Sequence, residues 1–524
     1  MGKVKNILFV MYDQLRADYL GCAGHPTLAT PNFDAFAKRS VLFSRAYCQS
    51  PVCGPSRVSF YTGRYMSSHG AGYNNVPFSI DQWTLGDYMR TVGMRSVLVG
   101  KTHMAPDQAG MKRLSIEGAS NLGVWIGQCG FEPFERDDGL HPDQSLNPNL
   151  VYNDYLRTQG YSSDNPWHDF ANSAEGPNGE ILSGWHMRYA RLPARVADEH
   201  SETPYMTGRA IEFLEQVGVT PWCLHLSLIK PHWPYVVPHP YNDMYSTNQI
   251  LPVNVTRKEI ENRHPVVGAF MDHEGSQNFR REEVRQTVIP AYMGLITQCD
   301  DQFGRLIAYL EEKGRMDDTM IVVTSDHGDY LGDHGLAEKD LLHEEVARIP
   351  MIIYDPDPTA DGRRGVVDDR FVEAIDLIPT FLDSQAGDMH EHRLEGRSLL
   401  PLLRCGEIAT WRDAVFSETD YTFHPARRAL ELGPEGARAY MIRTNDWKYI
   451  LYEGFSPQLF HLAEDPQEQN DLGEDSYYAE RRAELHERLF QWLRNRRQRS
   501  TLTHQEVEQR TGNAKARGFL FGVW

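Results

Sequence analysis

Short runs of consecutive apolar residues alternate along the first two thirds of the chain with segments in which apolar residues recur every three or four positions. The first pattern predicts buried strands, and the second predicts helices that pack one face on a core. The predicted strands are residues 6–11, 95–99, 222–228, 319–324 and 349–354. The predicted helices are residues 31–39, 84–92, 201–217 and 282–313. This alternation predicts an α/β fold in which a large, mainly parallel sheet is sandwiched by helices.

Two other segments break the alternation. Residues 105–200 are rich in Gly, Pro, Asn, Asp and Trp and show little periodicity, which is typical of a functional insertion. After about residue 386 the pattern changes to short paired strands, at 439–443 and 447–452, and then to an Arg-rich amphipathic helix at 477–496. We therefore predict a catalytic α/β domain at 1–385, a smaller C-terminal α+β subdomain at 386–499, and a tail at 500–524.

Composition and charge exclude several classes of function. The 524 residues include 53 Lys and Arg against 72 Asp and Glu, so the formal net charge of −19 argues against nucleic acid as a partner. Because no apolar run approaches the ~18 residues of a membrane span, we expect no membrane partner. The apolar run at 7–11 is too short for a signal-peptide core. The seven cysteines are scattered, without a Cys-x-x-Cys pair, which favours free thiols and a cytoplasmic location.

The polar tail ends in large apolar side chains, at Phe519, Leu520, Phe521 and Trp524. Such side chains are unfavourable at an exposed terminus unless another surface covers them. We therefore expect a homo-oligomer, a dimer or a tetramer, with this tail packed across an interface.

Ionisable or amide side chains follow four of the predicted strands. These residues are Asp13 and Gln14, Lys101 and His103, Lys230 and His232, and Asp326, His327 and Asp329. The carboxyl ends of parallel strands meet at one edge of a sheet, where α/β proteins form their binding sites. Loop capping could explain any one of these groups, but four groups at the same edge predict a catalytic site.

A further cluster of signals lies between the first two of these strands. Cys53-Gly-Pro-Ser-Arg57, followed by Thr62-Gly-Arg64, predicts a helix whose first turn holds a cysteine. A helix N-terminus lowers the pKa of a thiol and attracts anions. A lone cysteine is more often a small buried apolar residue, but the whole string outweighs that interpretation.

This string resembles the maturation signature of the formylglycine-dependent sulfatases of the alkaline phosphatase superfamily. The resemblance continues in Gly100-Lys101-x-His103, Pro231-His232-x-Pro234, Ser325-Asp326-His327-Gly328, and Gly332-Asp333-His334-Gly335 with Lys339. It implies an alkaline phosphatase-like fold and the hydrolysis of sulfate monoesters. It also implies a partner, the maturation enzyme that oxidises Cys53 to formylglycine, whose hydrate is the nucleophile.

Two pairs of residues depart from the common arylsulfatase pattern of Asp-Asp and Asp-Asn. Asp13-Gln14 and Asp326-His327 resemble instead the bacterial phosphonate monoester hydrolases and the choline sulfatases, and Asn74-Asn75-Val76-Pro77 also resembles the former. Lys101 and His103 resemble the sulfatase pair. We therefore expect an arylsulfatase-type enzyme that also accepts phosphonate monoesters and phosphodiesters, small molecules in each case.

Three alternatives stay open. Phosphonate monoesters or phosphodiesters could be the main substrates, or the substrate could be choline sulfate, which would need an aromatic or acidic cage for its quaternary ammonium. A non-catalytic binding protein is the remotest reading, since such a protein would be expected to have lost Cys53, Arg57 or a metal ligand.

The resemblance and the residue types assign a role to each candidate. The predicted ligands of one divalent metal, Ca²⁺ or Mn²⁺, are Asp13, Gln14, Cys53, Asp326 and His327. The predicted catalytic residues are Cys53 as nucleophile, Arg57 to hold the hydrate and balance charge, His103 to accept a proton, and His232 to protonate the leaving oxygen. The predicted substrate contacts are Lys101 and Lys339 on the non-bridging oxygens, and Asn74 as a neutral contact.

Overall fold

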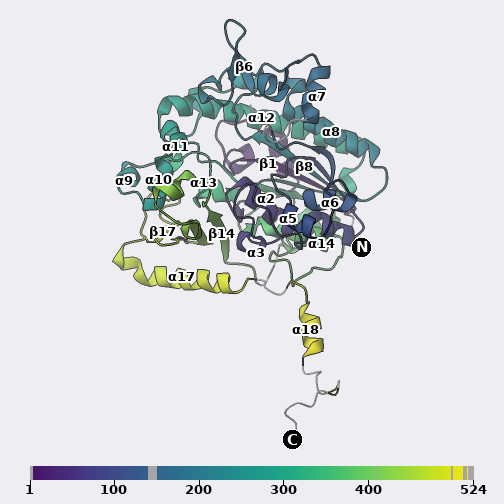
Figure 1. The fold of residues 1–524 in the computed structure, drawn as a ribbon, viewed down its shortest axis with the longest axis vertical. Helices are drawn as coiled ribbons and strands as arrows, with labels where there is room; N and C mark the ends of the chain where they lie inside the picture. The colour runs from purple at the N-terminus through teal and green to yellow at the C-terminus, as the bar shows by residue number, and fades with distance from the viewer. Residues whose placement is uncertain are drawn as a thin grey trace.

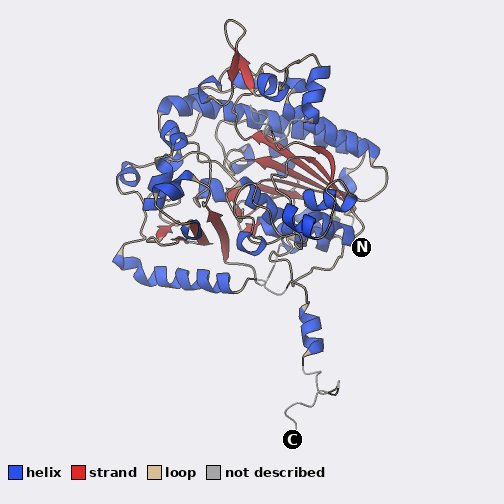
Figure 2. Cartoon of the chain, in the orientation of Figure 1, coloured by secondary structure: helices blue, strands red, loops and turns tan. Residues whose placement is uncertain are grey.

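A computed structural model of the protein describes residues 4–139, 150–406, 408, 410–496, 500–511, 516 and 518. Its central feature is an eight-stranded sheet (Figure 1, Figure 2). The strands, in spatial order, are β12 (Val366–Asp368), β2 (Val41–Phe43), β11 (Met351–Tyr354), β9 (Thr319–Ser325), β1 (Asn6–Asp13), β8 (Trp222–Pro231), β4 (Arg95–Gly100) and β5 (Glu132–Arg136). The five strands from β9 to β5 are parallel, whereas β11 runs antiparallel to both of its neighbours. The predicted mainly parallel sheet is confirmed.

Strand β1 shows why helices cover both faces of this sheet. All of its residues are buried, and successive side chains of a strand point to opposite faces. Leu8 and Val10 belong to one apolar core, and Ile7 and Phe9 belong to the other. The helices of the first core are α1 (Pro31–Ala37), α8 (Glu202–Gln216) and α12 (Glu282–Glu312). The helices of the second core are α2 (Cys53–Thr62), α4 (Leu85–Thr91) and α14 (Leu377–Ser384).

The segment predicted as an irregular insertion, residues 105–200, forms several small elements and one strand of the main sheet. They are α5 (Gln108–Arg113), α6 (Asn121–Gly127), β5, α7 (Val151–Thr158), and the hairpin of β6 (Ser173–Glu175) and β7 (Ile181–Ser183). Strand β5 pairs in parallel with β4 at the edge of the sheet. The hairpin is the outermost feature at the top of Figure 1.

The C-terminal region contains a separate four-stranded antiparallel sheet. Its strands, in order, are β14 (Ala414–Asp420), β15 (Arg438–Thr444), β16 (Trp447–Tyr452) and β17 (Gln458–His461). Helix α17 (Ala479–Arg494) packs Leu485, Leu489 and Trp492 against this sheet. The sequence predicted this subdomain, but helix α15 (Leu400–Arg404) still packs in the core of the main sheet. The domain limits therefore stay a prediction.

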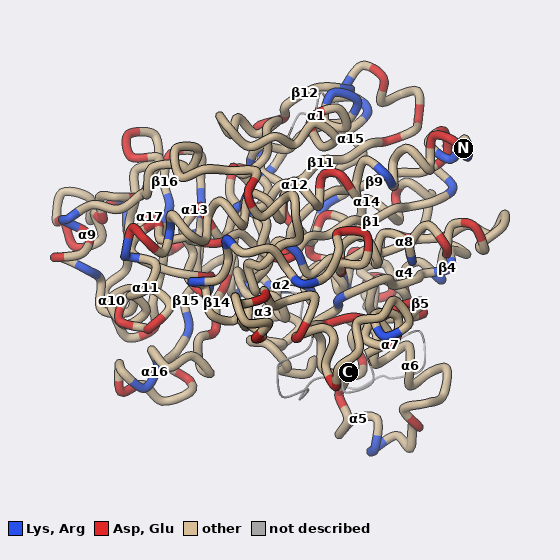
Figure 3. Tube along the Cα trace, turned by 90° about the horizontal axis from the view of Figure 1, so that it is seen from above, with Lys and Arg blue, Asp and Glu red and all other residues tan. Residues whose placement is uncertain are grey.

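The cysteines, the helix lengths and the charged positions can be set beside the expectations from the composition. All seven cysteines are free, as predicted. None of the helices in the described part of the chain is long and apolar enough to cross a membrane. Acidic and basic positions are mixed along the trace in Figure 3.

Helix α18 (His504–Arg510) stands apart from the body in Figure 1. The apolar residues Phe519, Leu520, Phe521 and Trp524 lie outside the described residues, so the predicted oligomer contact stays a prediction.

Candidate active site

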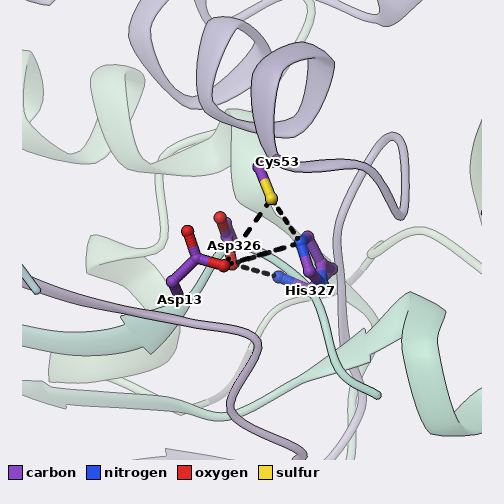
Figure 4. Close-up of side chains that lie close together, drawn as sticks. All are labelled: Asp13, Cys53, Asp326 and His327. Atoms are coloured by element: carbon purple, nitrogen blue, oxygen red, sulfur yellow. Dashed lines mark hydrogen bonds and ion pairs between the residues drawn. The ribbon is translucent and has the colours of Figure 1, made fainter. Parts of the chain in front are cut away.

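Four buried side chains meet where β1 and β9 end and α2 begins (Figure 4). Asp13 is the last residue of β1, Asp326 and His327 follow β9 directly, and Cys53 is the first residue of α2. Each offers one ligand atom, and these atoms all lie within 4.8 Å of one another. The sheet topology thus brings together four of the five predicted metal ligands from three distant parts of the chain.

Cys53 lies at the centre of this cluster. Its Sγ is 3.1 Å from His327 Nε2 and 3.6 Å from Asp13 Oδ1, and Lys339 Nζ donates to it at 3.1 Å. Burial would raise the pKa of the thiol, but Lys339, Lys101 and His327 together hold that pKa well below its ordinary value. The site therefore stabilises negative charge on the atom that residue 53 presents.

Arg57 lies one turn along α2 and is completely buried. Its Nε donates to Asp326 Oδ2 at 2.8 Å, its Nη2 to Asp13 Oδ2 at 3.1 Å, and its Nη1 to Ser227 Oγ at 2.6 Å. Arg57 thus fixes the two carboxylates that face Cys53. This contact differs from the predicted one with the hydrate, because the guanidinium orients the ligands of the cluster from outside.

The two carboxylates carry more negative charge than a buried site favours without a cation. Burial and the charge of Asp13 raise the pKa of Asp326. Burial would also raise the pKa of Asp13, yet Lys101, His232 and Arg57 hold it below its ordinary value. Because two neighbouring buried carboxylates repel each other, a divalent cation between them would relieve the repulsion.

The donor set also fits a divalent metal. His327 donates from Nδ1 to the Gly328 carbonyl at 2.8 Å, which leaves Nε2 facing Cys53 and the carboxylates. Oxygen ligands suit Ca²⁺, and an imidazole also admits Mn²⁺. The cluster is therefore a candidate metal site, and the identity of the metal stays a prediction.

Gln14, the fifth predicted ligand, has an unusual backbone conformation. Its φ of 65° lies in the left-handed region, and its backbone N–H donates to Asp326 Oδ1 at 3.0 Å. Its amide Nε2 donates to Asp329 Oδ2 at 2.5 Å, so Oε1 faces Lys339 Nζ at 3.0 Å. Asp329, to which sequence reasoning gave no role, therefore sets the orientation of the Gln14 amide. Its place in the group of ionisable residues after β9 was the available signal.

Lys339 links the cluster to His232. Its ammonium donates to Gln14 Oε1 at 3.0 Å, Cys53 Sγ at 3.1 Å and His232 Nε2 at 3.1 Å. The other ring nitrogen of His232 donates to the Trp233 carbonyl at 2.6 Å. Burial and the charge of Lys339 lower the pKa of His232 to about 4. The imidazole is neutral here, and its Nε2 accepts from Lys339.

The remaining residues singled out in the sequence are Lys101, Asn74, His103 and Lys230, and each has a different environment. Lys101 Nζ donates to Asp13 Oδ2 at 2.5 Å, and Asn74 Oδ1 accepts from the Gly54 backbone N–H at 2.8 Å. Asn74 thus fixes the first turn of α2. His103, with a φ of 51°, has a buried Nδ1 without a hydrogen-bond partner. Lys230 donates instead to Asn172 Oδ1 and the Pro234 carbonyl and holds the loop after β8.

A cavity of about 330 Å³ lies beside this cluster, because Lys101 and Lys339, which contact Asp13 and Cys53, are part of its lining. Its polar lining includes Asn74, Lys101, His103, His232 and Lys339, all of them predicted site residues. Its apolar lining includes Trp167, Trp185 and Trp233. Two of these tryptophans come from the segment at 105–200, so that segment forms part of the cavity wall.

A comparison with known protein families shows which family the chain belongs to. The Sulfatase family model matches residues 5–385, most of the chain. This chain belongs to the sulfatase family. The model described as N-sulphoglucosamine sulphohydrolase, C-terminal, matches residues 332–495. Membership confirms the resemblance seen in the sequence and makes the chain an enzyme of the sulfuric ester hydrolase class.

The relatives of this sulfatase include both an arylsulfatase and a phosphonate monoester hydrolase. The chain is 30% identical to the multifunctional alkaline phosphatase superfamily protein PehA of Trinickia caryophylli, over 95% of this chain and 97% of the relative. It is 28% identical to an arylsulfatase of Clostridium perfringens, over 94% and 95% of the two chains. The structure of the phosphonate monoester hydrolase of Agrobacterium radiobacter superimposes with a TM-score of 0.81 at 28% identity, over 94% and 95% of the two chains. The alkaline phosphatase-like fold is thereby confirmed.

Proposed function

We propose that this sulfatase hydrolyses sulfate monoesters, with the matured side chain of residue 53 as nucleophile and one divalent metal. The observation that carries the proposal is the placement of Cys53 Sγ among Asp13, Asp326 and His327, with Lys339 Nζ at 3.1 Å. In the matured enzyme the Sγ position stands for an oxygen of formylglycine. A buried atom that is held by cations at the floor of a cavity is suited to attack an anionic ester.

The protein would hold the metal through Asp13, Gln14, Asp326, His327 and residue 53. When bound, such a metal lowers the pKa of a hydroxyl on residue 53 so that it can attack. Arg57 would keep the two carboxylates in place through its 2.8 and 3.1 Å hydrogen bonds. These residues orient the nucleophile, and they do so before the substrate arrives.

The remaining residues would act on the ester. Lys101 and Lys339 present ammonium groups to the non-bridging oxygens, whose negative charge grows in the transition state. His232, whose Nε2 lies 3.1 Å from Lys339 Nζ, would take up a proton and pass it to the leaving oxygen as the general acid. His103 has the unpartnered ring nitrogen that a proton acceptor for the second step would need.

Phosphonate monoesters are the second candidate substrates. Gln14 and His327 replace the residues of the common arylsulfatases, and the fold is close to a phosphonate monoester hydrolase at 28% identity. The same metal site and cations suit both reactions, because both transition states place negative charge on the oxygens around the central atom.

The test compares kcat/KM for a phenyl sulfate ester and a phenyl phosphonate monoester with the same leaving group. We expect the sulfate to be the better substrate, with measurable turnover of the phosphonate. A higher kcat/KM for the phosphonate would make the enzyme a phosphonate monoester hydrolase. Turnover of neither ester by enzyme with converted Cys53 would overturn the proposed function.

A further inference from the structure

Two acidic residues on either side of Lys339 line the same cavity as the predicted catalytic groups. Asp340 is 8% exposed, and its Oδ1 is buried without a hydrogen-bond partner. Within the described residues, neither Glu338 nor Asp340 forms an ion pair. A desolvated carboxylate without a partner is costly, so these side chains need an explanation beyond packing.

Lys339 acts on its two neighbours through its charge: among the described residues, no hydrogen bond joins its ammonium to either carboxylate. Its ammonium donates instead to Gln14, Cys53 and His232. Burial raises the pKa of Glu338, and the charge of Lys339 is the strongest influence that opposes this increase. For Asp340, burial and the charge of Glu338 raise the pKa to about 7, although the charges of Lys339 and His327 oppose this increase.

The backbone adopts an unfavourable conformation at both of these acidic residues. Glu338 has a φ of 57° and Asp340 a φ of 87°, in a region that residues with a Cβ adopt only under constraint. Strained residues of this kind are concentrated at ligand-binding sites. The alternation turns Lys339 toward Cys53 and leaves Asp340 at the cavity wall, beside Tyr73, whose hydroxyl pKa it raises.

Aromatic rings complete this side of the cavity. Trp167, Trp185 and Trp233 contribute to the wall, and the rings of Trp185 and Trp233 meet edge to face with centroids 4.9 Å apart. The faces of tryptophan rings attract cations. The cavity lining therefore combines the ammonium groups of Lys101 and Lys339 with the carboxyl group of Asp340 and three tryptophans.

We propose that this enzyme prefers esters whose alcohol carries a cationic nitrogen, and that Asp340 is the residue that binds this nitrogen beside the tryptophans. This specificity rests on the proposed function, because the same cavity must hold the ester. A protonated amine would donate a hydrogen bond to Asp340 Oδ1, and a quaternary ammonium would use the ring faces. The shared chemistry is a positive charge a few bonds from the ester oxygen.

Matched pairs of esters test the proposal. Choline sulfate is compared with neutral 3,3-dimethylbutyl sulfate, and 2-aminoethyl sulfate with neutral propyl sulfate. For wild type we expect kcat/KM of at least one cationic ester to exceed that of its neutral counterpart by about tenfold, equivalent to about 1.4 kcal/mol. The pair that shows the preference identifies the kind of ammonium group. Ratios near one for both pairs would overturn the proposal.

Variants assign the effect to one carboxylate. In Asp340→Asn the ratio should fall toward one. The control is Asp317→Asn, which removes the same charge from an exposed position before β9, at the opposite end of the sheet, and should keep the wild-type ratio. An unchanged ratio in Asp340→Asn, or an equal loss in Asp317→Asn, would contradict the assignment.

A binding measurement separates this proposal from the proposed function. Tetramethylammonium chloride should change the tryptophan fluorescence of wild type more than sodium chloride does at equal ionic strength, and Asp340→Asn should weaken the response whereas Asp317→Asn should not. This readout needs no turnover, so it holds even if neither ester is hydrolysed or Asp340→Asn does not fold. Identical responses to the two salts in wild type would overturn the cation site.

Discussion

At the scale of single residues, the site depends on one buried guanidinium. Arg57 joins Asp13 and Asp326 through hydrogen bonds of 3.1 and 2.8 Å, and all three side chains are fully buried. The two carboxylates come from different chain segments, the end of β1 and the residue after β9, and Arg57 holds both by hydrogen bonds in one position relative to Cys53. Without it, the predicted metal ligands lose their common orientation.

Arg57→Gln therefore tests the role of this residue. Residues that orient metal ligands from outside typically contribute ~10- to 100-fold to metal affinity or activity. We expect the apparent affinity for the activating metal to fall by about that factor, and kcat/KM at saturating metal to fall as well. Metal titrations of chelator-treated enzyme give both values.

The matched control for this variant is Arg95→Gln. Arg95 forms a half-exposed ion pair with Glu132 at 2.7 Å, at the start of β4 and far from the cluster. Exposed pairs contribute little, so metal affinity should stay at the wild-type value. A wild-type metal titration curve for Arg57→Gln would show that the carboxylates keep their positions unaided.

Several candidate residues could be found from the sequence because they follow a strand or begin a helix, and the resemblance to the sulfatases supplied others, such as Asn74 and Lys339. Asp13, Asp326 and His327 follow apolar runs, and Cys53 begins a helix that Gly63 ends. Their partners could not be found in this way. Asp340 has a left-handed backbone and lies in the cavity wall, and no periodicity of the sequence encodes either.

At the scale of elements, the contact between β4 and β8 sets the position of Lys101. Gly100 ends β4 with a φ of 106°, and a Cβ at this position would lie 2.0 Å from the carbonyl oxygen of Ser227 in β8. The next residue, Lys101, donates its backbone N–H to that same carbonyl at 2.9 Å. A side chain at position 100 would therefore force the two strand ends apart.

Gly100→Ala should lower both stability and activity. We expect Tm to fall by several degrees and kcat/KM by at least tenfold, because Lys101 loses its position next to Asp13. The control is Gly362→Ala, since a Cβ at this exposed glycine meets no atom within 4 Å. If Gly100→Ala had the Tm and kcat/KM of Gly362→Ala, the close approach of the two strands would not matter.

The hydrophobic pattern of the sequence predicts a strand correctly where all of its residues are buried, and it misses a strand where few of them are. All ten residues of β8 are buried, and the sequence predicted this strand as an apolar run. The edge strand β5 was missed because Glu132–Arg136 contains only one apolar side chain besides Pro133, and only one of its residues is buried. Strand β5 forms because it pairs with its neighbour β4, and its own sequence does not show this pairing.

At the scale of the whole molecule, a buried histidine couples the fold to pH. His225 in β8 accepts from the Tyr61 hydroxyl at 2.9 Å and donates to the Phe9 carbonyl at 3.0 Å. Burial lowers its pKa to about 3. In the unfolded chain a histidine binds a proton below about pH 6.5, whereas the folded chain excludes it. The free energy of unfolding therefore falls as the pH falls from about 6.5 toward 3.

His225→Gln tests this coupling. One such histidine contributes about 1.4 kcal/mol of unfolding free energy per pH unit between about pH 6 and 4. We expect the variant to be less stable at pH 7 but to have a shallower pH dependence by that amount, measured by urea unfolding at several pH values. The exposed variant His504→Gln, which leaves the core unchanged, should follow wild type. Equal slopes for His225→Gln and wild type would place the acid sensitivity elsewhere.

The most direct test of the central claim is kcat/KM of Cys53→Ala on a phenyl sulfate ester, beside wild type and Cys48→Ala. Cys48 is also buried, but its Sγ contacts the Val346 carbonyl and takes no part in the cluster. We predict that Cys53→Ala has no activity above the uncatalysed rate, whereas Cys48→Ala stays within a few-fold of wild type. Full activity of Cys53→Ala would contradict the assignment of residue 53 as the nucleophile.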